Sequence, residues 1–148
     1  MKRGLKVLLV EDSVADATLI IEVFEEEKIS VDVAVVRDGI ECMEFLQKAI
    51  VESESGASVL PDLMLLDLNL PRMDGREVLT AIKAHPVLCS IPVVILTTSQ
   101  SEEDVLRSYS LQASCYVTKP LALDQFVKIV RSIDEFWFTA VKYPAKHK

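Results

Sequence analysis

The 148-residue sequence has no excess of positive charge: 16 lysines and arginines stand against 23 aspartates and glutamates, giving a net charge of -7. Proteins that bind DNA or RNA directly usually need a basic face that neutralises phosphates. The sequence also lacks any run approaching ~18 consecutive apolar residues, so no membrane span is expected, and no signal peptide is visible. We therefore predict a cytoplasmic protein that binds neither nucleic acid nor membrane.

Cysteines are few, and their number and spacing argue against a disulfide framework or a thiolate metal site. Cys42, Cys89 and Cys115 are odd in number, share no metal-ligand spacing and lie in or beside apolar runs. Such residues are typically buried free thiols in a reducing cytoplasm. Because 50% of the residues are hydrophobic, the chain can fill one core, but it is too short for two ordinary domains.

Apolar runs that predict strands alternate with segments of helical spacing. We predict strands at 5–10, 31–36, 63–67, 91–96 and 115–117, helices at 14–27, 40–50, 75–84, 101–109 and 123–140, and a polar surface loop at 51–58. Asp38 is a predicted N-cap of the second helix, and Asp74 and Glu77 have the spacing of a capping box at the start of the third. Parallel strands need crossover connections, so this alternation predicts an α/β fold with helices on both faces of a parallel sheet. The first, third and fourth runs are the most apolar, which favours a doubly wound five-stranded sheet of order 2-1-3-4-5.

Carboxylates follow two of the central strands. Asp67 ends the third run, and Glu11 and Asp12 follow the first. In a doubly wound sheet the ligand site lies beyond the carboxyl ends of the strands, here between the first and the third, so these side chains should meet. Three clustered carboxylates repel one another and a bare anion unless a hard divalent cation lies among them. The sequence therefore predicts a Mg²⁺ site.

The same edge of the sheet predicts phosphoryl chemistry. A nucleotide- or flavin-binding α/β protein would have glycines and hydroxyls after the first strand, where this chain has two carboxylates. With a metal bound, Asp67 can accept a phosphoryl group, and Thr97 and Lys119 at the next strand ends can neutralise its oxygens. Each residue alone is ordinary, but together they predict one site.

These motifs resemble, in order and spacing, the receiver domain of two-component response regulators, which has a flavodoxin-like fold. The resemblance covers about residues 5–135 and rests on Val10–Ser13, Leu66–Pro71, Asp74–Gly75, Leu96–Thr97 and Tyr116–Pro120. It implies that Asp67 is the phosphoacceptor for a sensor histidine kinase. It also implies that Asp12 and Asp67 ligate Mg²⁺ directly, Glu11 through water and Asn69 through its backbone carbonyl.

The resemblance further implies a conformational switch. Thr97 and Lys119 would bind the phosphoryl oxygens, and Tyr116 would turn inward when Thr97 is drawn toward the phosphate. Proteins of this family act in signal transduction. We therefore expect no enzymatic activity other than the chain's own phosphorylation and dephosphorylation. The stretch Asp74–Leu79 and the C-terminal aromatics look most like stand-alone regulators that partner phytochrome-type histidine kinases. We accordingly expect residues 1–148 to be a single receiver domain with an extended C-terminal helix and tail and no output domain.

The C-terminal aromatics predict an interface. Phe136, Trp137 and Phe138 are consecutive, and successive helical residues point about 100° apart, so the three rings cannot all face one core. We favour a partner surface over coverage by the residues of the tail. The resemblance implies a homodimer through the fourth helix, fifth strand and fifth helix.

Two other functions compete with this interpretation. A haloacid-dehalogenase-like phosphatase also uses Asp, Mg²⁺, Thr and Lys, but its nucleophile belongs on the first strand in an Asp-x-Asp pattern. Here the candidate nucleophile is on the third strand, and residue 69 is Asn. A receiver-like interaction module that never takes a phosphate is the other alternative, and an intact set of site residues argues against it.

Overall fold

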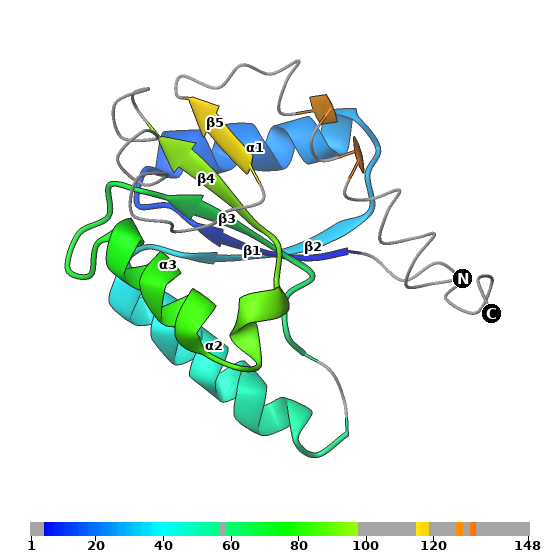
Figure 1. Cartoon of the computed structure of the whole chain (residues 1–148). Coiled ribbons are helices and arrows are strands. Elements are labelled where there is room, and N and C mark those ends of the chain that lie inside the picture. Colours follow the sequence, from blue (N-terminus) through cyan, green and yellow to red (C-terminus); the bar gives the residue numbers. More distant parts are fainter. Residues whose placement is uncertain (1–4, 57–58, 98–114, 119–126, 129–130, 133–148) are drawn as a thin grey trace.

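The computed structural model describes residues 5–56, 59–97, 115–118, 127–128 and 131–132, with the backbone alone at 97 and 115–118 (Figure 1). Its elements, in chain order, are β1 (Leu5–Val10), α1 (Val14–Glu26), β2 (Val31–Val36), α2 (Gly39–Ser53), β3 (Leu63–Asp67), α3 (Gly75–Ala84), the 3-10 helix η1 (Leu88–Ser90), β4 (Val93–Thr97) and β5 (Cys115–Thr118). The predicted 101–109 helix lies outside the described residues, and the described residues of the predicted last helix, 127–128 and 131–132, are helical.

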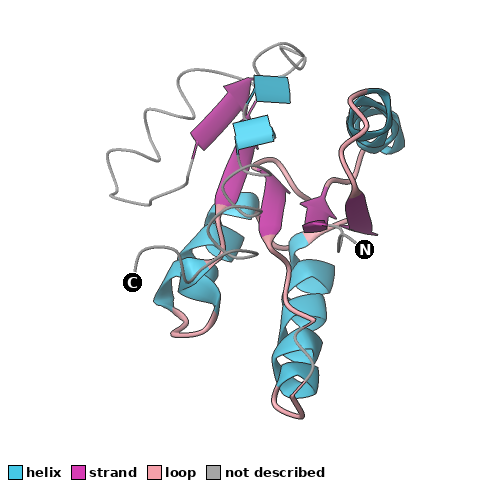
Figure 2. Cartoon of the chain, turned by 90° about the vertical axis from the view of Figure 1, so that its right-hand side faces the viewer, coloured by secondary structure: helices cyan, strands magenta, loops and turns pink. Residues whose placement is uncertain are grey.

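The five described strands form one parallel sheet in the order β2-β1-β3-β4-β5. This confirms the predicted α/β class and strand order. All five residues of β3 are buried, because helices cover both sides: α1 lies on one face, and α2 and α3 lie on the other (Figures 1 and 2). A sheet covered in this way needs almost continuous apolar strands, which explains why the central runs lack alternation.

The core has two halves, one on each face of the sheet. Although the central strands are apolar throughout, neighbouring residues of a strand still point to opposite faces. On the α1 face, Leu9 and Leu65 pack with Ile20 and Phe24, whereas on the other face Leu66 packs among residues of α2 and α3 such as Leu46. The strands at the centre of the sheet are therefore fixed from both sides, and so are the positions of the residues that follow them.

Capping side chains fix where each helix begins after its strand. The Ser13 hydroxyl accepts from the Asp16 amide at 3.2 Å, and the predicted cap Asp38 accepts from the Glu41 amide at 2.9 Å. The predicted capping box at the start of α3 is also confirmed, with Asp74 as the cap. Because a capped helix satisfies its first amides locally, these short turns hold the carboxyl edge of the sheet in place.

Two boundary predictions are wrong: β4 begins at Val93 and not at residue 91, and the second helix ends later than predicted. The sequence predicts a loop over residues 51–58, but α2 continues to Ser53. No glycine or proline lies in residues 51–55, and the Glu54 amide still donates to the Ile50 carbonyl at 3.2 Å. The helix ends just before Gly56, whose φ of 109° is a conformation that favours glycine.

Among the described residues, no helix combines the length and apolar character needed to span a membrane.

The two cysteines whose side chains the structure describes should differ sharply in reactivity. Cys42 is buried and Cys89 is exposed, and burial raises the pKa of the Cys42 thiol to about 12. Because the thiolate is the reactive species, a thiol reagent at pH 8 should modify Cys89 quickly and leave Cys42 intact. Peptide mapping by mass spectrometry would measure this, with the denatured protein as the control in which both react. Equal rates for the two thiols in the folded protein would contradict the packing of α2.

Candidate functional site

Three carboxylates meet at the carboxyl edge of the sheet. The side chains of Glu11, Asp12 and Asp67 each place a carboxylate oxygen within 4.8 Å of the others. Glu11 and Asp67 are only 2% and 3% exposed, whereas Asp12 is open to solvent. The strand register explains the cluster, because Val10 of β1 lies beside Leu66 of β3, so the next residues of the two strands emerge together. The predicted meeting of these three residues is confirmed.

Backbone hydrogen bonds hold the acidic residues in this arrangement. The Glu11 amide donates to the Val36 carbonyl at 3.0 Å, which ties the end of β1 to β2. One oxygen of Asp67 accepts from the Asn69 amide at 3.0 Å, and one oxygen of Glu11 accepts from the Ser13 amide at 3.2 Å. Both buried carboxylates are thus oriented by the turns that follow their own strands.

The start of α3 lies directly against the end of β3. The Gly75 amide donates to the Leu68 carbonyl at 3.1 Å. A Cβ atom added to Gly75 would lie 2.5 Å from the Asp67 carbonyl oxygen and 2.8 Å from Leu68 Cα, closer than such atoms can approach. Glycine is therefore required at this position by close backbone packing, and Asp67 is held at the base of a tight strand-to-helix turn.

The donor set fits a hard divalent cation. All three side chains offer oxygen, the ligand that Mg²⁺, Mn²⁺ and Ca²⁺ prefer. Bringing three carboxylates together is unfavourable when they are charged, and a cation among them would offset that repulsion. Two of the carboxylates are buried and one is exposed, so an ion could reach the site from solvent and keep bound waters.

The structure describes the other predicted site residues only in part. The β4 register pairs Asp67 with Leu96, and Thr97 with Thr118, so the Thr97 backbone lies at the same edge of the sheet. Tyr116 is in β5 beside Ile95. The side chains of Thr97 and Tyr116, and all of Lys119, Phe136, Trp137 and Phe138, lie outside the described part of the chain. Their predicted roles remain predictions.

An ion pair that the sequence did not reveal lies beside this edge. Arg72, in the loop between β3 and α3, donates through Nε and Nη2 to the two oxygens of Asp38 at 2.9 and 3.0 Å. The Arg72 guanidinium holds the pKa of the Asp38 carboxyl below its usual range. Sequence reasoning assigned Asp38 only a helix cap. No spacing rule links positions 38 and 72, because fold topology alone brings them together.

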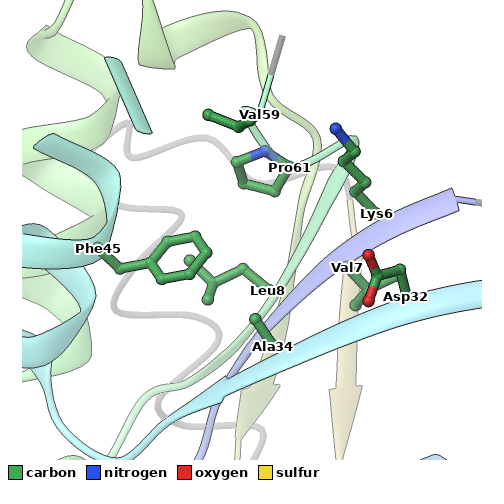
Figure 3. Close-up of a pocket in the computed structure, with 8 residues that line it drawn as sticks. All are labelled: Lys6, Val7, Leu8, Asp32, Ala34, Phe45, Val59 and Pro61. Carbon is green, nitrogen blue, oxygen red and sulfur yellow. The ribbon is translucent and has the colours of Figure 1, made fainter. Parts of the chain in front are cut away.

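A separate concavity opens at the opposite edge of the sheet. Its volume is about 200 Å³, and Figure 3 shows Phe45 of α2 facing Leu8 and Ala34, with Lys6, Asp32 and Pro61 around it. Lys6, Asp32 and Pro61 lie at the amino ends of β1, β2 and β3. The pocket shares no residue with the acidic cluster, so the two features are independent.

Comparison with known proteins defines the class. The family model for the response regulator receiver domain matches residues 7–131. The match covers well over half of the chain, and the chain belongs to this family. It is therefore a signalling protein, and its family is the one that the sequence motifs indicated. The position of Asp67 on β3 and not on β1 also argues against the phosphatase alternative.

The most similar proteins found include phytochrome-associated regulators. The chain is 48% identical over 139 residues to the response regulator Rcp1 of Synechocystis sp. (strain ATCC 27184 / PCC 6803 / Kazusa), covering 94% of this chain and 92% of Rcp1. The phosphorylated cyanobacterial phytochrome response regulator RcpA is similar in structure, with a TM-score of 0.72, 47% identity and coverage of 91% of this chain and 94% of RcpA. The Mn²⁺-bound form of Rcp1 gives a TM-score of 0.71 and 48% identity, with 90% and 94% covered. The predicted relationship is confirmed.

Proposed function

We propose that this chain accepts a phosphoryl group on Asp67 from a sensor histidine kinase, with Mg²⁺ bound at the acidic cluster. The observation that carries the proposal is the convergence of Glu11, Asp12 and Asp67 within 4.8 Å at the carboxyl edge of the sheet. The Mn²⁺-bound state of Rcp1, 48% identical, supports a divalent cation here. The phosphorylated state of RcpA, 47% identical, supports phosphoryl transfer.

Asp67 suits the acceptor role better than its two neighbours. It lies on a central strand, is 3% exposed and has one oxygen fixed by the Asn69 amide. A carboxylate held in one orientation is a better nucleophile for in-line attack than a mobile one, because less ordering is needed at the transition state. Asp12 is exposed, and Glu11 directly follows the neighbouring strand β1, so both suit metal binding.

Each residue of the site would have a separate role in phosphoryl transfer. Asp12, Asp67 and the Asn69 carbonyl would hold Mg²⁺ directly and Glu11 through water, and the ion would neutralise charge on the transferring phosphoryl oxygens. An Asp67 oxygen forms a bond to phosphorus while the bond from phosphorus to the kinase histidine nitrogen breaks, leaving an acyl phosphate. The Thr97 hydroxyl and the Lys119 ammonium would bind the phosphoryl oxygens.

The relationship to phytochrome regulators supports the finer assignments. Sequence identities of 47% and 48% to RcpA and Rcp1 favour a phytochrome-type kinase as the donor. Residues 5–135 would act as one receiver unit. On phosphorylation, Tyr116 would turn inward as Thr97 is drawn toward the phosphoryl group. Phe136, Trp137 and Phe138 would contribute to a homodimer formed through the fourth helix, fifth strand and fifth helix.

Mg²⁺ should stabilise the folded protein, because the ion offsets repulsion among carboxylates that only folding brings together. At a free concentration of about 100 times its dissociation constant, the added stability should be about 2.7 kcal/mol. Urea unfolding with and without Mg²⁺ measures this. Asp12→Asn is the matched control, since it removes one proposed ligand from an exposed position and should lose most of the gain. Unchanged wild-type stability in excess Mg²⁺ would contradict the metal site.

A further inference from the structure

The Arg72–Asp38 ion pair joins two loops at the carboxyl edge of the sheet. Arg72 lies in the loop of residues 68–74, which follows Asp67 and leads into α3. Asp38 is the N-cap of α2, and its Oδ1 atom also accepts from the Glu41 amide at 2.9 Å. The two Arg72 bonds, at 2.9 and 3.0 Å, therefore tie this loop to the first turn of another helix.

Close packing accompanies the ion pair. A Cβ atom added to Gly39 would overlap the Met73 carbonyl oxygen and would lie 2.6 Å from Met73 Cβ. The loop thus rests directly on the start of α2. The two ends of the loop are joined by the bond from the Gly75 amide to the Leu68 carbonyl. Between these two attachments lies Asn69, which is exposed and is bonded through its amide to Asp67.

This ion pair differs from an ordinary surface pair. The Arg72 side chain is 56% exposed, but the Asp38 side chain is only 11% exposed. Exposed pairs usually contribute little, and the exceptions are bidentate arginine–carboxylate pairs of good geometry. Arg72 also has a φ of 64°, a left-handed conformation that non-glycine residues adopt only when their surroundings impose it. The loop is therefore held in one conformation by contacts with α2.

We propose that the Arg72–Asp38 ion pair positions the metal site by holding the 68–74 loop against α2. The Asn69 carbonyl and the Asp67 carboxylate then stay where a cation needs them. The inference rests on the proposed function, because it assumes that Mg²⁺ binds at Glu11, Asp12 and Asp67. Arg72 is a positioning residue and touches neither the ion nor the phosphoryl group.

Charge alone would act differently from positioning. If only long-range electrostatics mattered, removing the Arg72 cation would strengthen Mg²⁺ binding and removing the Asp38 anion would weaken it. If the ion pair positions the loop, either loss weakens binding, and losing both costs no more than losing one. The sign of the change at Arg72, and the additivity of the two losses in the double variant, therefore separate the explanations.

Arg72→Asn and Asp38→Asn, alone and together, provide the test. Asparagine tolerates the left-handed conformation at 72 and caps a helix as well as aspartate at 38. Calorimetric titration with Mg²⁺ should show each single variant weakened about tenfold, and the double variant equally so. Phosphorylation by acetyl phosphate should need about tenfold more Mg²⁺ while keeping its rate at saturating Mg²⁺. Arg76→Gln removes a cation from the first turn of α3 and its ion pair with Asp74 but leaves the Arg72–Asp38 pair in place, and it should bind like the wild type.

The outcomes distinguish the two levels of the proposal. A wild-type protein that does not bind Mg²⁺ would overturn the proposed function itself. If the wild type binds Mg²⁺, three results would each overturn the positioning role. These are single variants with unchanged affinity, single variants whose affinities shift in opposite directions, and a double variant whose loss of affinity is the product of the two single losses. Arg72→Lys, which keeps the charge but can donate only one well-placed bond, serves if an asparagine variant unfolds. It should give an intermediate affinity, and a wild-type value would likewise overturn the role.

Discussion

Asp67→Asn should abolish phosphorylation of the chain by acetyl phosphate in the presence of Mg²⁺. The amide keeps the size of the side chain and can still accept the hydrogen bond from the Asn69 amide. It lacks the negative oxygen that must attack phosphorus, and it removes one proposed metal ligand. Intact-mass measurement should show one added phosphoryl group on the wild type and none on the variant.

Asp62→Asn is the matched control for this substitution. Asp62 directly precedes the first residue of the same strand, β3. Its carboxylate accepts from the Lys6 amide at 2.8 Å, and an asparagine side chain can keep this bond. It is absent from the acidic cluster, so this variant should be phosphorylated like the wild type. A full equivalent of phosphate on the Asp67→Asn protein would show that another residue is the acceptor.

Gly75→Ala should be among the most destabilising substitutions in the described part of the chain. Alanine favours helices over glycine by roughly 1 kcal/mol, so propensity alone predicts a gain at this first residue of α3. The new Cβ would instead lie 2.5 Å from the Asp67 carbonyl oxygen and 2.8 Å from Leu68 Cα. Backbone atoms cannot rotate away as a side chain can, and we expect a net loss of about 3 kcal/mol, measured by urea unfolding.

Gly56→Ala separates steric overlap from the loss of glycine's flexibility. Nothing lies within 4 Å of a Cβ at Gly56, but its φ is 109°, so the cost there is backbone strain of about 1 kcal/mol. Gly75→Ala should cost more than this and should also weaken Mg²⁺ binding, whereas Gly56→Ala should leave binding unchanged. A stabilised Gly75→Ala protein would mean that the turn after β3 is looser than the structure shows.

Much of the fold could be predicted from the sequence because local and global preferences agree. The apolar run at Leu63–Leu66 cannot satisfy a half-exposed strand, so it predicts a central position, and β3 is fully buried. Once strands one and three are placed side by side, the meeting of Glu11 and Asp12 with Asp67 follows from topology. The caps at Asp38 and Asp74 were predictable because their bonds reach only two or three residues along the chain.

Contacts between distant loops could not be predicted in the same way. The Arg72–Asp38 pair spans 34 positions, and its formation depends on how α2 and the 68–74 loop pack. The requirement for glycine at 39 likewise depends on Met73, which no local pattern places there. The end of α2 was misjudged because polar residues such as Glu52 suit an exposed helical turn as well as a loop.

Chemical identification of the phosphorylated residue tests the central claim most directly. The wild-type chain would be treated with acetyl phosphate with and without Mg²⁺, reduced with borohydride to convert an acyl phosphate into a stable alcohol, and mapped by peptide fragmentation. We predict modification at Asp67 alone, and only when Mg²⁺ is present. Modification at Glu11, at Asp12 or at a residue away from the acidic cluster, or equal labelling of Asp67 with the metal removed, would contradict the account.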